Sequence, residues 1–408
     1  MSGGPVVRSP GMPALLAVTF TGFSGYAALI AVAPLWAVRG GSDEVGAGLV
    51  NAVLLLSTVA AQPFVPRVLA RFGQPAVIGG GLVLLGLPAL GYGLSDELLP
   101  VLAMSALRGI GFAVLTVIGS ATVALLVPPA RLGAAIGVYG LGIALPMLLL
   151  LPASVPIADS LGFWVVFVLG ALPLLGIPAV PALARAVTRN RSPAPHSGSE
   201  PVSDAESAPD AGARSGLTTP TPGRFDILRR VGPSMIILLS VTLSGGALMT
   251  FLPQLVPSSG LAALCLFLIS LGAAFSRWLA GSLADRAGPK PFLVPLLLLT
   301  GLGMAGVAWW VHRTPPAWVL LLAVTVVGLG YGALQNLTLL VAFQAVSRDR
   351  VNQASAAWNM GFDAGTGLGA LVTGYLATAF SFPAAYLVLA AVCVAAVAVT
   401  ARVPAQAR

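Results

Sequence analysis

The sequence predicts an all-α integral membrane protein with twelve transmembrane helices, arranged as two pseudo-symmetric halves of six. Its 408 residues are 57% hydrophobic and only 8% charged, with a mean hydropathy of +0.95. A soluble domain of this size needs more charge than that to cover its surface. The apolar residues also form runs long enough to cross a bilayer as helices, and these runs repeat in two sets.

Each apolar run is interpreted as one membrane-spanning helix. The first run is too long for the apolar core of a cleavable signal peptide, and it leads directly into the next span. The expected spans are 12–36, 46–66, 75–94, 98–126, 132–153, 161–184, 230–253, 259–283, 290–311, 316–342, 351–377 and 382–402.

A polar stretch divides the twelve spans into two sets. Residues 192–199 and those that follow are rich in proline, serine, alanine and glycine, a composition typical of disordered linkers. We therefore expect an N-terminal six-helix half at 1–184, a disordered cytoplasmic linker at 185–229 and a C-terminal six-helix half at 230–408.

Basic residues indicate the orientation of the chain. With the N-terminus in the cytoplasm, all but four of the 21 lysines and arginines fall in cytoplasmic segments. Arg39 and Arg313 fall in outer loops, and Arg108 and Arg277 fall inside spans. The positive-inside rule then places both termini in the cytoplasm, and it explains the net charge of +8 without a nucleic-acid partner. The predominance of arginine over lysine is typical of high-GC bacterial genes, so we expect a bacterial inner membrane.

A charged loop between the eighth and ninth spans carries the most specific motif. Residues 281–290 read G-S-L-A-D-R-A-G-P-K. Gly281 allows two helices to approach closely, and Gly288 can adopt the positive φ of a tight turn. Asp285 can face the positive N-terminus of a neighbouring helix. This combination predicts a structured loop directly after a membrane helix.

The other charges of this loop point to a gate. Arg286 needs an acidic partner, for which Asp349 after the tenth span is the best candidate, and Lys290 keeps the loop on the cytoplasmic side. The pattern G-x-x-x-D-R-x-G-x-K resembles the cytoplasmic loop signature of the major facilitator superfamily of secondary transporters. The resemblance implies that a pair between Arg286 and Asp349 braces the inward gate.

The two halves of the chain repeat each other. A weaker copy of the loop lies at 66–75 in the first half, where Arg71 and Gly73 are kept but Ala70 replaces the acid. A nearly equal offset along the chain pairs 109–112 with 328–331. The resemblance to the superfamily implies two halves related by an axis along the membrane normal, a substrate site between them near mid-membrane, and a monomer.

Arg108 lies in the fourth span, at a depth of about 15 Å along the helix. A charge at this depth is costly and needs a reason. The context Leu107-Arg108-Gly109 partly resembles the fourth-helix signature of superfamily members, in which an arginine is linked to proton transfer. Three roles are open: binding an anionic substrate group, tuning a proton carrier, or bonding to backbone carbonyls for helix packing.

Asp363 is the only acidic residue inside an expected span, about 18 Å from the start of the eleventh. Desolvation at that depth favours the protonated carboxyl group. An acid that loads and unloads a proton as access alternates is what a proton-coupled transporter needs. The alternative is a structural partner for a buried arginine, with Arg277 in the eighth span as the intramembrane charge partner.

Gln335, Asn336 and Asn359 are polar candidates for lining the substrate cavity. In the superfamily, helices one, four, seven and ten line it, which favours Gln335 and Asn336. So few polar groups predict a mostly apolar cavity, which suits a lipophilic or amphipathic substrate better than a free sugar.

The sequence carries no recognised catalytic or metal-binding motif. Cys265 and Cys393 lie inside apolar runs, and His196 and His312 lie in the linker and a loop. With no HExxH motif, Cys/His cluster or Ser-His-Asp grouping, we expect neither an enzyme nor a metal or cofactor site.

These observations predict a secondary active transporter that moves a small lipophilic or amphipathic drug or metabolite across the inner membrane by alternating access. Proton-coupled efflux by antiport is the first interpretation. A proton-coupled importer of an organic anion, using Arg108, is the second. A sensor or scaffold that keeps the fold without transport is the third.

Overall fold

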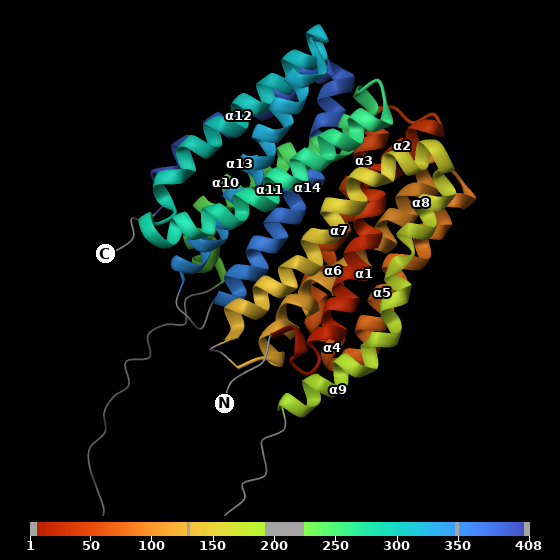
Figure 1. Ribbon diagram of the computed structural model, residues 1–408, viewed down its shortest axis with the longest axis vertical. Coiled ribbons are helices and arrows are strands. Elements are labelled where there is room, and N and C mark those ends of the chain that lie inside the picture. The colour runs from red at the N-terminus through yellow and green to blue at the C-terminus, as the bar shows by residue number, and fades with distance from the viewer. Residues whose placement is uncertain (1–5, 129–130, 192–223, 347–350, 404–408) are drawn as a thin grey trace, which may run out of the picture.

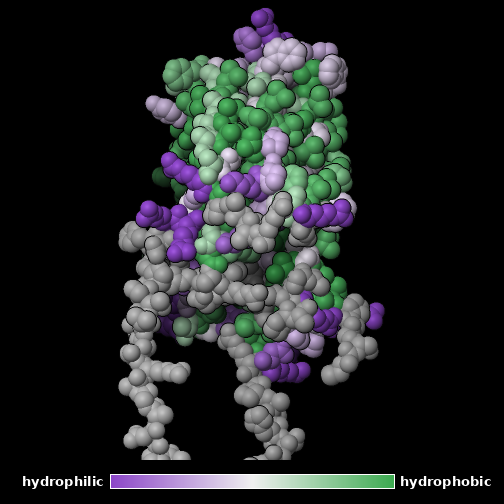
Figure 2. Space-filling model, turned by 90° about the vertical axis from the view of Figure 1, so that its left-hand side faces the viewer, coloured by the Kyte–Doolittle hydropathy of each residue, from purple (hydrophilic) through white to green (hydrophobic). Residues whose placement is uncertain are grey.

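The computed structural model describes residues 6–128, 131–191, 224–346 and 351–403 of the chain (Figure 1). Throughout these residues the regular elements are helices, and eleven helical segments are long and apolar enough to cross a membrane. The N-terminal half, coloured red to yellow in Figure 1, lies beside the C-terminal half, coloured green to blue. Figure 2 shows a band of hydrophobic side chains with hydrophilic ones gathered toward its ends, as expected for a membrane protein. The predicted fold class is confirmed.

The N-terminal half contains six spans, some of them broken into shorter helices. Its elements are η1 (Val6–Arg8), α1 (Met12–Ile30), α2 (Val32–Arg39), α3 (Glu44–Ala61), η2 (Gln62–Phe64), α4 (Val65–Phe72), α5 (Gln74–Gly91), η3 (Tyr92–Leu94), α6 (Leu98–Leu126), α7 (Leu132–Leu161), α8 (Phe163–Gly170), η5 (Leu172–Ala179) and α9 (Val180–Arg191).

The C-terminal half has longer uninterrupted helices. Its elements are α10 (Arg224–Leu255), α11 (Ser259–Ala287), α12 (Lys290–Arg313), α13 (Ala317–Gln344), α14 (Val351–Ala379), α15 (Phe382–Ala395) and α16 (Val397–Thr400).

Helix α14 is the twelfth helix of membrane length, with 29 residues. It has no membrane-length stretch as apolar as those of the eleven other spans, because it carries Asp363 and several glycines and threonines. This composition is tolerated because α14 packs against α10 of its own half and α3 of the other half, so little of it needs to face lipid.

The linker is shorter than the sequence indicated. Residues 185–191 belong to α9 and residues 224–229 belong to α10, so both segments are helical rather than part of the linker. The arginines at the end of α9 are compatible with a helix that continues past the apolar span, because a long side chain can reach the polar surface from there. Residues 192–223, with the proline-rich stretch, lie outside the described residues.

A proline shapes the first span and creates a contact point for the second half. Pro34 has no N–H to bond the carbonyl of Ile30 four residues earlier, and the span breaks at Ala31 between α1 and α2. The carbonyl of Ile30 instead accepts a hydrogen bond of 2.8 Å from the Asn51 amide on α3. Asn51 also donates at 2.8 Å to Thr250 of α10, in the other half.

The repeated loop takes the same backbone turn in both halves. Gly73 follows α4 with φ 78° and ψ 164°, and Gly288 follows α11 with φ 75° and ψ 166°. Both values lie where only glycine is unstrained, which explains why the glycine survives in the weaker copy of the motif. We call the end of the bundle that carries these turns the motif end, and the other the opposite end.

Helices α3 and α14 run antiparallel and form the main contact between the halves. Small residues allow their backbones to touch: a Cβ at Gly48 would lie 2.5 Å from the carbonyl oxygen of Ala370, and one at Gly374 would lie 2.4 Å from that of Glu44. Gly367 packs in the same way against α3. This register brings the beginning of α3 to the end of α14, at the opposite end of the bundle.

Four side-chain hydrogen bonds between described residues join the halves. Two lie near the opposite end, from Thr378 to Glu44 at 3.3 Å and from Ser259 to Asp159 at 2.8 Å. The bond from Asn51 to Thr250 lies deeper, and the bond from Gln62 to Asp363 lies deepest. We call these contacts the seam. It holds the halves together from the opposite end to the level of Asp363.

We expect Gly48→Val to push the halves apart at the seam, because the new side chain meets a backbone carbonyl that cannot rotate away. Overpacking of this kind costs about 1–3 kcal/mol, which lowers the population of the closed seam by about 5–150-fold. The matched control is Gly79→Val, because a Cβ at Gly79 has no atom within 4 Å.

Glu97 and Arg313 are both exposed at the opposite end, one in each half. With cysteines and spin labels at these two positions, double electron–electron resonance measures the distance between the labels and so the separation of the halves. The Gly48 variant is expected to shift this distance distribution to longer values and the Gly79 variant to leave it alone. An unchanged distribution in the Gly48 variant contradicts the close α3–α14 register.

Candidate substrate and proton site

Three polar side chains lie at a similar depth between the halves. Gln62 directly follows α3, which begins at Glu44, and Arg277 stands equally far along α11 from its first residue, Ser259. Each therefore lies about 27 Å along its helix from the opposite end. Asp363 lies about 24 Å from the end of α14 on the same side. The internal repeat and the antiparallel α3–α14 pair bring these residues to one level.

The carboxyl group of Asp363 is buried at the seam and bonded to Gln62. Its side chain is 4% exposed, and Oδ2 accepts a hydrogen bond of 2.8 Å from Gln62 Nε2. Arg277, the partner expected from the sequence, instead donates to Oε1 of Gln335 on α13. The expected pair of Asp363 with Arg277 is thus corrected: each charged group is held by a neutral amide on a neighbouring helix.

The contacts of Gln62 and Arg277 are related by the internal repeat. Gln62 donates at 3.4 Å to Thr116 on α6, and Arg277 donates to Gln335 on α13. The offset of the loop motif relates Gln62 to Arg277, and the offset that pairs 109–112 with 328–331 relates Thr116 to Gln335. Each half therefore contains the same side-chain hydrogen bond between two corresponding helices. Only the donor in the C-terminal half, Arg277, is charged.

We call Gln62, Asp363, Arg277 and Gln335 the polar cluster. Two of its amide atoms are buried without a hydrogen-bond partner among the protein atoms. They are Oε1 of Gln62, an acceptor, and Nε2 of Gln335, a donor. The side chains are 5% and 1% exposed. An unpaired buried polar atom costs about 1–3 kcal/mol. Oε1 of Gln62 therefore needs a donor, such as a protonated acid, a water molecule or a ligand, and Nε2 of Gln335 needs an acceptor, such as a water molecule or a ligand.

The side chain of Arg277 is exposed, although it lies close to the buried face of α11. At 100° per residue it lies within about 60° of the buried Ala273 and Ala280 around the helix axis. It lies about 100° or more from Phe275 and Trp278, which are 53% and 70% exposed on the outer stripe. More than a third of the Arg277 side chain is nevertheless accessible. Arg277 therefore lies at the edge of the buried stripe of α11, on the flank toward α13, where its guanidinium group contacts Gln335.

Arg108 is fully buried and bonded to backbone. Its side chain is 0% exposed, Nε donates at 3.2 Å to the carbonyl of Leu85, and Nη2 donates at 2.9 Å to the carbonyl of Gly25. Its guanidinium also lies 5.7 Å from the centre of the Tyr92 ring. Of the three roles left open by the sequence, these contacts describe the packing role, in which Arg108 ties α6 to α5 and α1.

The asparagines expected to line a cavity bond to backbone carbonyls. Asn336 donates at 2.7 Å to the carbonyl of Arg277, and Asn359 donates at 2.9 Å to that of Ser355 on its own helix. Both side chains are half-buried. Asn336 thus fixes α11 to α13 directly beside Arg277, whereas Asn359 makes a local contact on α14.

The loop motif is built as a close helix contact followed by a glycine turn. A Cβ at Gly281 would lie 3.1 Å from Asn336 Nδ2, so this glycine lets α11 approach α13. Lys290 donates at 2.8 Å to the carbonyl of Val403 and ties α12 to the C-terminal segment. Arg286 is exposed. The side chain of Asp285 and the whole of Asp349 lie outside the described residues, so the proposed pair of Arg286 with Asp349 stays a prediction.

Aromatic side chains adjoin the polar cluster. Phe362, next to Asp363, stacks on Trp358 with ring centres 5.7 Å apart and lies 6.3 Å from Tyr331. A second cluster in the other half stacks Tyr26 on Phe112 at 4.4 Å. Phe362 and Trp358 are half-buried, so they offer apolar surface beside the buried acid.

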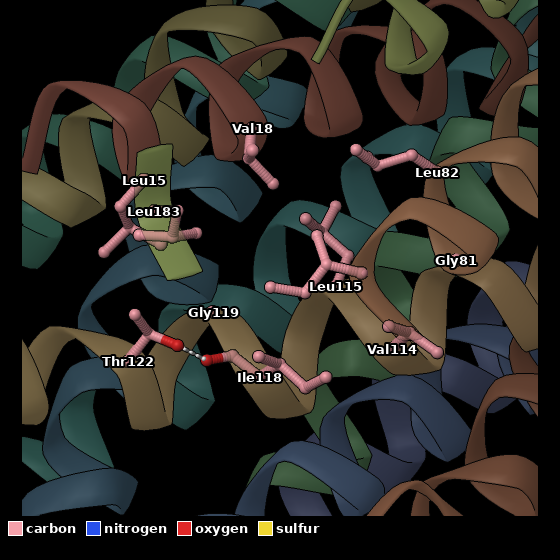
Figure 3. A pocket seen from close by; sticks show the side chains of 11 residues that line it. Leu15, Val18, Gly81, Leu82, Val114, Leu115, Ile118, Gly119, Thr122 and Leu183 are labelled. Atoms are coloured by element: carbon pink, nitrogen blue, oxygen red, sulfur yellow. Dashed lines mark hydrogen bonds between the residues drawn. The ribbon is translucent and has the colours of Figure 1, made fainter. Parts of the chain in front are cut away.

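Two cavities lie away from this cluster. A small one of about 10 Å³ lies inside the N-terminal half, where Leu15, Val18, Leu115 and Ile118 turn toward one space (Figure 3). It holds one water molecule at most. A larger one of about 320 Å³ lies at the opposite end, near the Asp159–Ser259 bond. Neither contains Asp363, Arg277 or Gln335.

Two helical halves that meet around an acidic side chain buried midway along the helices form the architecture of a secondary transporter. The sequence profile of the Major Facilitator Superfamily matches residues 14–355 and 234–407. The chain therefore belongs to this superfamily, and it is a transporter and not an enzyme.

Solved structures of other superfamily members have the same fold. A bacterial homolog of the human lysosomal transporter Spinster, inward-facing and unoccupied, is 17% identical with a TM-score of 0.64, over 98% of this chain and 96% of that chain. A D-xylose-proton symporter is 15% identical with a TM-score of 0.71, over 96% and 97%. A peptide transporter in complex with alafosfalin is 16% identical with a TM-score of 0.71, over 98% and 97%. No curated protein sequence matches the chain.

Proposed function

We propose that the protein is a proton-coupled secondary transporter that exports small lipophilic or amphipathic molecules by alternating access. The observation that carries the proposal is Asp363, a carboxyl group buried at the deepest bond of the seam. A group placed there changes its surroundings whenever the halves separate or close.

The chemistry of that position suits a proton carrier. An ionised carboxylate without a cationic partner is costly in a dry interface, and the bond to Gln62 is made by a neutral amide. Closing the seam therefore favours the protonated acid. Opening the seam hydrates the acid and lets it release the proton, which couples proton movement to the alternation of the two halves.

The positive-inside rule supports an orientation with the motif end and both termini in the cytoplasm of a bacterial cell. The seam then closes the transporter toward the outside of the cell. A substrate in the cytoplasm can approach Arg277 from the motif end. An exporter in this conformation is ready to load substrate. A monomer is sufficient for this cycle because both halves belong to one chain.

The alternative of an organic-anion importer that uses Arg108 has less support, because Arg108 is fully buried and bonded to two carbonyls. The aromatic surface of Phe362 and Trp358 favours a substrate with an apolar body. A sensor or scaffold without transport is distinguished by the experiment that follows.

Substrate-evoked proton movement tests this function. The purified protein is placed in proteoliposomes with a pH-sensitive dye inside, and lipophilic cations, neutral drugs and organic acids are added in turn. At least one class is expected to move protons, and an imposed pH difference is expected to drive that class against its gradient. Transport of a substrate with no proton movement rejects the coupling, and no transport of any class favours the sensor.

A further inference from the structure

We propose that Arg277 and Gln335 bind an anionic group of the substrate, so that the cargo is an organic anion with an apolar body. This inference rests on the proposed transport function and names the class of molecule that the same site accepts. It is independent of Arg108, the arginine to which the sequence pointed for this purpose.

Arg277 is a cation without an acidic partner among the described side chains. Its side chain donates to a neutral amide oxygen, and Asp363, the acid at the same depth, is bonded to Gln62 instead. The guanidinium group of Arg277 keeps further N–H donors, and a carboxylate accepts from such donors in a two-pronged geometry. Arg277 is exposed and lies on the flank of α11 next to α13, so we place it within reach of a solute bound between the halves.

Gln335 adds a second donor beside the guanidinium group. Its Oε1 accepts from Arg277, which orients the amide, and its Nε2 is buried beside the Tyr331 hydroxyl without a hydrogen bond of good geometry. That nitrogen is bonded to the same carbon as Oε1, so it lies next to the charge. Asn336 cannot fill it, because an asparagine amide nitrogen is a donor too, and the Asn336 nitrogen already bonds the Arg277 carbonyl.

Arg277 supplies a positive charge and N–H donors, and Gln335 supplies a further donor. This arrangement favours a negatively charged ligand that has several hydrogen-bond acceptors. A carboxylate fits this description, with one oxygen toward Arg277 and one toward Gln335. Phe362 and Trp358 on α14 form the adjoining aromatic surface, next to the buried Tyr331 on α13, and accommodate an aromatic or aliphatic body. A lipophilic cation, by contrast, meets repulsion from Arg277.

The substrate charge also determines how the cycle responds to membrane potential. Export of a monovalent anion in exchange for an entering proton moves two positive charges inward per cycle, so an inside-negative potential accelerates it. Import of the same anion with a proton moves no net charge. Potential dependence of naphthoate transport therefore separates antiport from symport without altering the binding proposal.

A set of three naphthalene probes tests the binding site directly. Naphthoate, naphthylmethylamine and naphthylmethanol share an aromatic body and differ in the charge of their head group. Their dissociation constants are measured by equilibrium dialysis on the full chain in lipid nanodiscs at neutral pH, with no pH gradient. Naphthoate is expected to bind at least about tenfold more tightly than the amine, in line with one charge-assisted hydrogen bond.

Variants then assign the binding to Arg277 and Gln335. Arg277→Gln is expected to weaken naphthoate binding at least about tenfold, and Arg277→Lys to weaken it less. Gln335→Glu keeps the size of the side chain and supplies a carboxylate to Arg277, so it is expected to remove the preference for naphthoate while leaving a folded protein. Arg313→Gln, at the opposite end, is the matched control and is expected to change nothing.

Absent naphthoate binding, equal binding of the three probes, or unchanged naphthoate binding in both Arg277→Gln and Gln335→Glu overturns the proposal. Proton coupling is judged separately, since dialysis involves no proton gradient. Anion binding without proton movement leaves this site in place and rejects the coupling, whereas proton movement evoked only by cations does the reverse.

Discussion

Replacing Asp363 with asparagine is expected to end the accumulation of substrate against its gradient while exchange of substrate across the membrane continues. Asparagine keeps the size of the side chain and accepts the bond from Gln62 Nε2, so the seam still closes. Its own amide N–H can also donate to the unpaired Oε1 of Gln62. What it cannot do is take up or release a proton.

The expected loss is large because all of the driving force passes through this group. With one proton per substrate and no membrane potential, each unit of pH difference sustains about a tenfold concentration ratio, and the variant is expected to reach only a ratio of about one. Two measurements on the same proteoliposomes separate the effects: uptake driven by a pH difference, and exchange of labelled for unlabelled substrate at equal pH.

Asp159→Asn provides the matched control for this variant. Asp159 is also an acid that accepts a hydrogen bond between the halves, from Ser259 at 2.8 Å, but it is exposed at the opposite end. It is expected to keep proton-driven accumulation. If Asp363→Asn accumulates substrate as well as the native protein does, the proton carrier is another group and Asp363 serves only to close the seam.

The pattern of apolar runs was sufficient to predict the helices, because a lipid environment leaves few alternatives to membrane-spanning helices. Its failures are local. Helix α14 is not among the eleven most apolar spans, yet the run at 351–377 was counted correctly as a span because it is long and lacks charges other than Asp363. The linker was drawn too long because charged residues at 185–191 and 224–229 ended the apolar runs but not the helices.

The partners of the buried charges could not be predicted in the same way. Charge complementarity suggested a pair of Asp363 with Arg277, but each of them is hydrogen-bonded to a glutamine. A glutamine is uncharged, so the pattern of charges along the sequence could not indicate it as a partner. Gln62 and Asp363 are also far apart in the sequence, in different halves of the chain. The one available signal was the repeat, which aligns Gln62 with Arg277 and so marks it as the corresponding position in the other half.

Arg108 shows why depth alone does not assign a role. Its position in α6 was predicted correctly, but the sequence left three roles open: binding an anionic substrate group, tuning a proton carrier, or bonding to backbone carbonyls. Which carbonyls accept its donors depends on how α1 and α5 pack against α6, at Gly25 and Leu85. That packing is a property of three helices together and has no counterpart in the local sequence around Arg108.

A short cross-link between cysteines at Asp159 and Ser259 is expected to arrest transport completely. In the structure Oδ2 of Asp159 lies 2.8 Å from Oγ of Ser259, so a short bis-methanethiosulfonate, which forms a reducible disulfide with each thiol and releases sulfinate, can join cysteines at these positions without moving either half. The link fixes the seam at the opposite end, and a transporter that must open this end to complete its cycle then stops. Cys265 and Cys393 are buried and compete poorly for the reagent.

Transport before cross-linking, after it, and after reduction of the link is measured in the same proteoliposomes. Activity is expected to fall to the level of empty liposomes and to return on reduction, while single-cysteine variants treated in the same way stay active. Binding of naphthoate is expected to survive in the linked protein, because Arg277 is accessible in the conformation with the closed seam. Loss of transport together with retained binding distinguishes an arrested cycle from a damaged site. Transport that continues under the link means that this end need not open, and it contradicts alternating access through the seam.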